Sequence, residues 1–144
     1  MFFLYQIILS SLLLISPIII IIRILKKKED KLRFIEKLSF NSEKRGLGEL
    51  IWFHGSSVGE IMSIIPLLNY YEKKKSIKKI LVTSSTLSSS KIIKKFKFKK
   101  IIHQFYPLDH FFLTKKFINY WKPNLAIFID SEIWPSMFKT IENK

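Results

Sequence analysis

The sequence has no cysteine, and its 144 residues include only four glycines, three arginines and one alanine. Without cysteine there is no disulfide framework and no cysteine-ligated metal site. Acidic residues are also scarce. Eleven of them stand against 25 lysines and arginines, which gives a formal net charge of +14. Hydrophobic residues make up 48% of the chain, and this excludes an intrinsically disordered protein, because disorder requires low hydrophobicity.

Lysine carries almost all of the positive charge. It occurs 22 times and isoleucine occurs 25 times. Both have A/T-rich codons, so a drift of the genome toward A and T is one explanation, and an anionic partner is the other. Between Lys73 and Lys100 lie eleven lysines and no acidic residue. This stretch is either a solvated surface or a face that attracts anionic lipid, at about 1 kcal/mol per basic residue. No nucleic acid is predicted as a partner, because groove-reading proteins commonly use arginine.

An apolar run without any charged side chain fills residues 1–22. As a helix it would reach about 30 Å, enough to cross the core of a bilayer. No basic residue precedes the run and no Ala-x-Ala site follows it, which favours an uncleaved anchor over a cleaved signal peptide. Six basic residues follow between positions 23 and 33, so the positive-inside rule predicts a cytoplasmic soluble part. We predict a single-pass transmembrane helix over residues 1–25.

Beyond a basic juxtamembrane connector over residues 26–48, strand patterns alternate with helix patterns. The predicted strands are 49–54, 79–83, 101–106 and 125–129, and the predicted helices begin at Val58, span 86–98 and 110–121, and begin again near Ile133. Asp109 is expected to cap the helix that starts at residue 110. This alternation indicates an α/β fold, a Rossmann-like parallel sheet with flanking helices, over residues 49–144. Such domains usually have five or six strands, so four strands suggest an incomplete domain.

In an open parallel sheet the ligand crevice lies at the carboxyl ends of the strands, so the loops that follow the strands matter most. The first loop holds Ser57, Gly59 and Glu60. Ser57 and Glu60 have the S-x-x-E spacing of a capping box, which is a structural role. A carboxylate in this crevice is also a candidate general base that takes a proton from an acceptor hydroxyl. The two roles are compatible.

Two other loops carry weaker signals. Thr83 and Thr86 follow the second strand, and their hydroxyls either bind a sugar or phosphate or serve as ordinary caps. Glu132 follows the fourth strand. Its carboxylate is either a first-turn residue that the helix dipole stabilises, or a group that binds a ligand or supports catalysis. His54 and His103 are interpreted as structural, because both lie in strand-like runs. No histidine pair has the spacing of metal ligands, and no P-loop or GxGxxG motif is present, so neither a metal nor a cofactor is predicted.

Four segments together resemble one protein family. They are KLRFIEKLSF (31–40), IWFHGSSVGE (51–60), LVTSSTLSSSKII (81–93) and YPLDHFFLTKKFINYWKPNLAIFIDSEIWPSMF (106–138). Their order and spacing are similar to those of the bacterial Kdo transferases, the 3-deoxy-D-manno-octulosonic acid transferases of lipid A biosynthesis. The pairing of H-x-x-S-V-G-E with a later E-[LI]-W-P is the most specific part of the resemblance.

The resemblance implies a GT-B glycosyltransferase with two Rossmann domains. The first domain faces the acceptor, and the second binds most of the CMP-Kdo donor. It implies metal-independent, inverting transfer of Kdo to a lipid A precursor (lipid IVA) at the inner face of the inner membrane. The family's proposed general base falls on Glu60, and the glutamate of its E-L-W-P motif falls on Glu132. Ser57 and Gly59 match the acceptor loop.

The sequence also departs from the family pattern. The usual Thr-Pro-Thr-Gly appears here as Thr86-Leu87-Ser88-Ser89, which loses the glycine. A second domain, which would bind the donor, is absent from these 144 residues. We therefore expect an acceptor-side half that transfers no sugar by itself. The alternative function is a non-catalytic, membrane-tethered module that binds anionic lipid.

Overall fold

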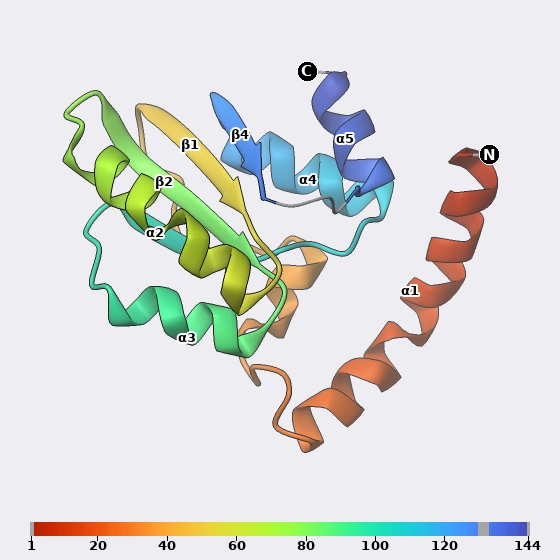
Figure 1. Ribbon diagram of the computed structural model, residues 1–144. Coiled ribbons are helices and arrows are strands. Elements are labelled where there is room, and N and C mark those ends of the chain that lie inside the picture. The colour runs from red at the N-terminus through yellow and green to blue at the C-terminus, as the bar shows by residue number, and fades with distance from the viewer. Residues whose placement is uncertain (1, 130–132, 144) are drawn as a thin grey trace.

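A long N-terminal helix precedes a short 3₁₀ helix and then strands and helices in alternation (Figure 1). The computed structural model describes residues 2–129 and 133–143. In chain order the elements are α1 (Phe2–Leu25), the 3₁₀ helix η1 (Arg33–Leu38), β1 (Glu49–His54), α2 (Val58–Lys73), β2 (Ile77–Ser84), α3 (Leu87–Lys95), β3 (Ile101–Phe105), α4 (Phe111–Trp121), β4 (Leu125–Phe128) and α5 (Pro135–Glu142). The predicted alternation of strands and helices is confirmed.

The four strands form one parallel sheet in the order β3-β2-β1-β4. Ile51 of β1 is paired with Ile80 of β2 on one side and with Leu125 of β4 on the other. The chain therefore builds the sheet outward from β1 to β3 and then crosses back to place β4 beside β1. Such a reversal of direction is where open α/β sheets bind their ligands, beyond the carboxyl ends of the strands.

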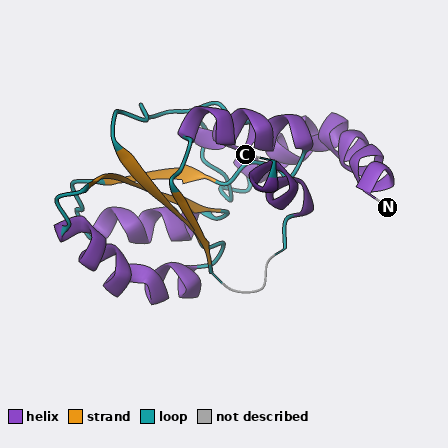
Figure 2. Ribbon diagram, turned by 90° about the horizontal axis from the view of Figure 1, so that it is seen from above, coloured by secondary structure: helices purple, strands orange, loops and turns teal. Residues whose placement is uncertain are grey.

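Helices cover both faces of the sheet (Figure 2). Side chains alternate across a strand, so β1 contributes Ile51 and Phe53 to the core under α2 and α3. Its intervening residues, Leu50 and Trp52, belong to the second core, which α4 and α5 complete. All four side chains are at most 5% exposed. Burial on both faces explains why this strand reads as an unbroken apolar run.

The predicted element ends shift by a few residues. The helix predicted over residues 86–98 ends at Lys95, because Lys97 adopts a left-handed conformation (φ 49°) that ends the helix. No glycine marks this position in the sequence, so the boundary was not visible there. The strand predicted over 79–83 is longer and spans Ile77–Ser84.

The predicted role of Asp109 as the cap of α4 is wrong, because it caps α5 instead. Its Oδ2 accepts a hydrogen bond from the backbone N–H of Ser136 (3.0 Å), and its Oδ1 accepts one from Met137 (2.9 Å). The N-cap of α4 is His110, whose Nδ1 accepts from the backbone of Phe112. At the start of α5 the carboxylate meets two amide groups that have no partner within their helix. Asp109 is only 4% exposed, so these contacts are buried.

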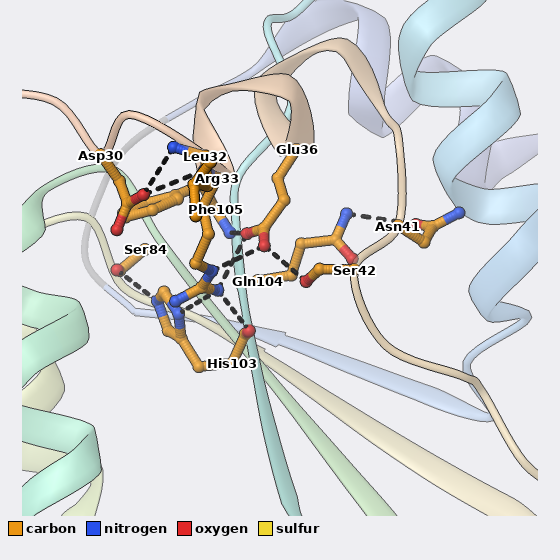
Figure 3. A network of polar contacts seen from close by, with 10 residues as sticks. All are labelled: Asp30, Leu32, Arg33, Glu36, Asn41, Ser42, Ser84, His103, Gln104 and Phe105. Carbon is orange, nitrogen blue, oxygen red and sulfur yellow. Dashed lines mark hydrogen bonds and ion pairs between the residues drawn. The ribbon is translucent and has the colours of Figure 1, made fainter. Parts of the chain in front are cut away.

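The connector folds back onto the outer edge of β3 (Figure 3). Arg33 Nη2 donates to the carbonyl oxygen of His103 (2.7 Å), and the backbone N–H of Phe105 donates to Glu36 Oε2 (2.7 Å). Glu36 is fully buried, and it also accepts two hydrogen bonds from Arg33 (2.7 and 2.9 Å) and one from Ser42. These five residues form what we call the β3 edge clamp. Their side chains satisfy backbone groups that an edge strand otherwise leaves open.

His103 is neutral within this clamp. Arg33 has only donors, so the Nδ1 of His103, at 3.0 Å, must accept, and its Nε2–H donates to Ser84 Oγ (2.8 Å). Burial lowers the pKa of His103 to about 3, and the positive charges of Arg33 and Lys94 add to this effect. The structural interpretation of His103 agrees with this geometry.

The free energy of unfolding should fall by about 2 kcal/mol between pH 7 and pH 5 on account of His103 alone. In the unfolded chain the pKa of His103 is about 6.5, so between pH 7 and pH 5 His103 becomes protonated in the unfolded state and stays neutral in the folded state. Acidification therefore favours unfolding until the folded pKa is reached. Urea titrations of the whole chain in detergent, followed by tryptophan fluorescence, should show this loss. The His103→Gln variant keeps a donor and an acceptor but does not titrate, so an equal pH dependence in both proteins would contradict the prediction.

Helix α1 lies beside the α/β domain (Figure 1). Polar side chains of its N-terminal half contact the domain. Tyr5 donates its hydroxyl proton to Asp109 Oδ2 (2.7 Å), and Gln6 Nε2 donates to Ser136 Oγ (2.7 Å). Ser10 Oγ lies 3.1 Å from the Nε2 of His110. The apolar side chains of α1 remain almost wholly exposed, and the segment Phe3–Leu25 is long and apolar enough to cross a membrane.

Candidate functional site

The carboxyl ends of β1 and β2 meet in a compact group of hydroxyl-bearing loops. The backbone N–H of Gly55 donates to the carbonyl oxygen of Thr83 (3.1 Å), which continues the sheet pairing by one residue. Ser56 Oγ lies 3.2 Å from Ser85 Oγ, and Ser89 Oγ donates to the carbonyl oxygen of Ser56 (3.2 Å). These bonds hold the N-terminal ends of α2 and α3 next to each other.

Glu60 stands in the first turn of α2 at this edge. The hydroxyl of Ser57 caps the helix by accepting from the backbone N–H of Glu60 (3.2 Å) and donates to Glu60 Oε1 (2.5 Å). Glu60 Oε2 accepts from the backbone N–H of Ser56 (2.7 Å). The predicted capping box is confirmed, with the backbone bond displaced from Ser57 to Ser56. Since two hydrogen bonds hold the carboxylate and the side chain is partly exposed among the described residues, Glu60 is both fixed and reachable.

Two glycines shape the space around Glu60. A Cβ on Gly55 would lie only 3.1 Å from the Cβ of Glu60, so the loop packs closely against the base of the Glu60 side chain. Among the described residues, a Cβ on Gly59 would meet only Ser57 Oγ, at 3.9 Å, and Gly59 is exposed. No other described residue therefore closes the side of the loop that carries Gly59.

Beneath this loop lies a buried polar floor. Thr83 Oγ1 accepts from the indole N–H of Trp52 (2.9 Å) and lies 2.9 Å from His54 Nδ1. His54 is 1% exposed, and its ring stacks on Tyr106 with centroids 3.9 Å apart. Burial lowers the pKa of His54 to about 4, so the ring is neutral near pH 7. A neutral, enclosed imidazole supports the loop and does not act as an acid at that pH.

The other predicted binding residues occupy different settings. Thr86 is exposed, and its hydroxyl caps α3 by accepting from the backbone N–H of Ser89 (3.2 Å). Thr83 is fully buried, and its hydroxyl contacts only protein groups. Glu132 lies outside the described residues. The structure therefore brings Ser57, Gly59 and Glu60 together, places Thr86 at the neighbouring helix start, and puts Thr83 one layer below.

Sequence reasoning missed the support that His54 gives to the loop. Its Nε2 lies 3.4 Å from Ser56 Oγ, in the same residue whose backbone N–H holds Glu60. The only signal was the position of His54 at the end of a buried strand, which does not reveal its partners. As for metals, within residues 2–129 and 133–143 no three His, Asp or Glu side chains gather as a group that could hold an ion.

The family model described as 3-deoxy-D-manno-octulosonic-acid transferase (kdotransferase) matches residues 28–144, which is most of the chain. The chain belongs to this Kdo transferase family. Its fold is accordingly that of the N-terminal domain of a GT-B enzyme, as the resemblance in the sequence implied.

Named Kdo transferases from distant organisms are similar to this chain. The 3-deoxy-D-manno-octulosonic acid transferase of Rickettsia bellii is 44% identical over 128 residues, which are 88% of this chain and 31% of the relative. A probable mitochondrial 3-deoxy-D-manno-octulosonic acid transferase of Arabidopsis thaliana is 38% identical over 105 residues, 73% of this chain and 24% of the relative. The 3-deoxy-D-manno-octulosonic acid transferase of Aquifex aeolicus is 31% identical over 105 residues, which are 73% of this chain and 28% of the relative. This chain thus spans less than a third of these Kdo transferases.

Proposed function

We propose that this chain is the acceptor-side domain of a Kdo transferase that moves Kdo from CMP-Kdo to a lipid A precursor, lipid IVA, with Glu60 as the general base. The observation that carries the proposal is the position of Glu60. It stands at the carboxyl end of β1, beside the reversal in strand order, and two hydrogen bonds fix it while one side stays open. Membership of the Kdo transferase family supports the choice of donor and acceptor.

In the proposed step, Glu60 takes the proton from a glucosamine hydroxyl of the acceptor. The hydroxyl oxygen forms a bond to the anomeric carbon of Kdo on the face opposite the phosphate. The bond between that carbon and the phosphate oxygen breaks, and CMP leaves with its electron pair. This is inverting transfer, it requires no metal, and the second domain of a longer protein would supply most of the donor contacts.

The neighbouring residues divide between contact and support. Ser57, Gly59 and Thr86 are exposed at the two helix starts, so we assign them contacts with the acceptor. Thr83 would act on the substrate through His54, because its own hydroxyl is buried against that ring and Trp52. Glu132 is assigned to the substrate from the sequence motif alone.

We place the domain on the cytoplasmic face of the inner membrane, with α1 alongside it at the membrane surface. Helix α1 contacts Asp109, His110 and Ser136, which lie in the loop after β3 and at the start of α5. These segments follow the carboxyl ends of the strands. The carboxyl ends of the strands, where Glu60 lies, therefore face the same side of the domain as α1. This arrangement suits an acceptor that remains in the lipid layer.

A transfer assay tests the function. Labelled Kdo, generated as CMP-Kdo, is offered with lipid IVA to this chain alone and to a longer Kdo transferase that begins with it. We expect labelled glycolipid from the longer protein and none from the 144 residues, because these span less than a third of the length of the Kdo transferases they match. A longer protein that hydrolyses CMP-Kdo, or that labels a different acceptor while leaving lipid IVA untouched, would contradict the assigned reaction.

The lysine-rich segment favours a second candidate function, a non-catalytic module that binds anionic lipid. The segment from Lys73 to Lys100 contains eleven lysines and no aspartate or glutamate. Vesicles with increasing phosphatidylglycerol distinguish the two functions. A membrane module would lose affinity steeply when these lysines are neutralised and would not depend on Glu60, whereas the transferase requires Glu60 for turnover.

A further inference from the structure

A cavity of about 450 Å³ separates the middle of α1 from the α/β domain. This volume is in the range of about 300–1,000 Å³ that is usual for small-molecule sites. Its walls are mainly apolar and include Leu9, Leu12, Leu13, Ile20, Leu108 and Trp134. Most apolar side chains of α1 outside the cavity are exposed, and the helix is apolar enough to lie in lipid. A hydrocarbon chain from that lipid suits the apolar cavity between α1 and the domain.

The polar groups of the cavity are confined to its ends. At one end Glu29 is buried and binds both Arg23 (3.1 Å) and Lys37 (2.6 Å), which leaves this group with a net positive charge. At the other end lie Asp109 and His110, which already bind α1. The apolar middle thus leads to a cationic group, an arrangement that complements a lipid with an anionic headgroup.

The indole ring of Trp134 forms part of the cavity wall, although its N–H is buried away from the open space. The ring also connects the cavity to the candidate site, because Trp134 packs on Tyr106 (5.4 Å between centroids) and Tyr106 stacks on His54.

We propose that this cavity binds one acyl chain of the acceptor glycolipid, so that α1 and the domain hold the acceptor between them. The proposal rests on the proposed function, since it names where the hydrophobic part of the same acceptor lies. It assigns α1 a part in recognising the substrate as well as in attachment to the membrane. The anionic part of the headgroup would then lie at the cationic end of the cavity, beside Arg23 and Lys37.

Quenching of tryptophan fluorescence by brominated acyl chains tests the proposal. The whole chain is placed in nanodiscs that contain a trace of lipid IVA with brominated chains, or the same mole fraction of brominated phosphatidylglycerol. Of the three tryptophans only Trp134 lines the cavity, whereas Trp52 and Trp121 are fully buried in the protein core, so a bromine atom in the cavity quenches Trp134 most strongly. We expect lipid IVA to remove the part of the emission that Trp134→Phe also removes, and phosphatidylglycerol to remove little.

A matched pair of variants on α1 supplies the control. Leu13 lines the cavity, whereas the adjacent Leu14 is 83% exposed. Leu13→Gln should make the cavity wall polar and weaken the quenching by lipid IVA, and Leu14→Gln should leave it unchanged. Equal quenching by both lipids, no quenching by either, or equal effects of the two variants would overturn the proposal. Quenching needs no turnover, so Glu60→Gln should leave it intact, and a failed transfer assay with intact quenching would reject only the proposed reaction.

Discussion

Replacing Glu60 by glutamine in a longer Kdo transferase that begins with this chain should lower kcat by about 10²–10⁴-fold, which is the usual contribution of a general base. The amide cannot take a proton from the acceptor hydroxyl. It can still accept from the backbone N–H of Ser56 and donate to the hydroxyl of Ser57, so both contacts of the capping box survive. The fold should therefore persist, and the loss should fall on kcat rather than on KM for the acceptor.

The control is Glu49→Gln at the opposite end of β1. Glu49 is exposed and starts the strand, so losing its charge removes one carboxylate from the same strand–helix unit without touching the crevice. We expect normal turnover from that variant and unchanged circular dichroism from both. Near-normal turnover with Glu60→Gln would reject the general-base role and leave Glu60 as a helix cap.

Replacing Glu36 by alanine should destabilise the domain by about 3–5 kcal/mol, the cost of removing one partner from a buried ion pair. The substitution leaves the guanidinium of Arg33 and the backbone N–H of Phe105 without their carboxylate. It also removes the acceptor of the Ser42 hydroxyl. Urea unfolding of the whole chain in detergent, with the α/β domain followed by tryptophan fluorescence, measures the change.

Two comparison variants sharpen this prediction. Asp30 accepts two backbone hydrogen bonds at the start of η1, and Asp30→Ala should cost only about 1 kcal/mol, as for other helix caps. The double change Arg33→Met with Glu36→Leu removes both charges together and should destabilise less than Glu36→Ala alone. If Glu36→Ala costs no more than Asp30→Ala, the clamp contributes little to stability.

The sequence predicted what depends on local pattern. The apolar run of β1 and the helical spacing that starts at Val58 are written in adjacent residues, and the capping box joins Ser57 to Glu60 only three positions away. Their placement at the carboxyl edge follows from parallel pairing. The long apolar helix at the N-terminus was likewise evident from its length and composition.

What the sequence did not predict depends on partners far along the chain. Glu36 binds the backbone of Phe105, 69 positions later, so the connector read as a charged linker and not as part of the sheet. Asp109 was assigned to the adjacent helix, whereas its partners Ser136 and Met137 begin the next one. Thr83 was predicted to bind substrate. The residues next to it in the sequence do not reveal that its hydroxyl contacts the side chains of Trp52 and His54.

The two edge strands of the sheet, β3 and β4, differ in whether another strand can pair with them. On the outer edge of β3, Arg33 and Glu36 of the β3 edge clamp bind the backbone groups of His103 and Phe105. These groups are therefore not available to pair with another strand. On the β4 side no strand is paired with the outer border within the described residues, and Leu125 is 46% exposed there. A further strand, whether from a longer chain or from a second copy, therefore has one place to add. The same open border is where unwanted self-association of the isolated domain would begin.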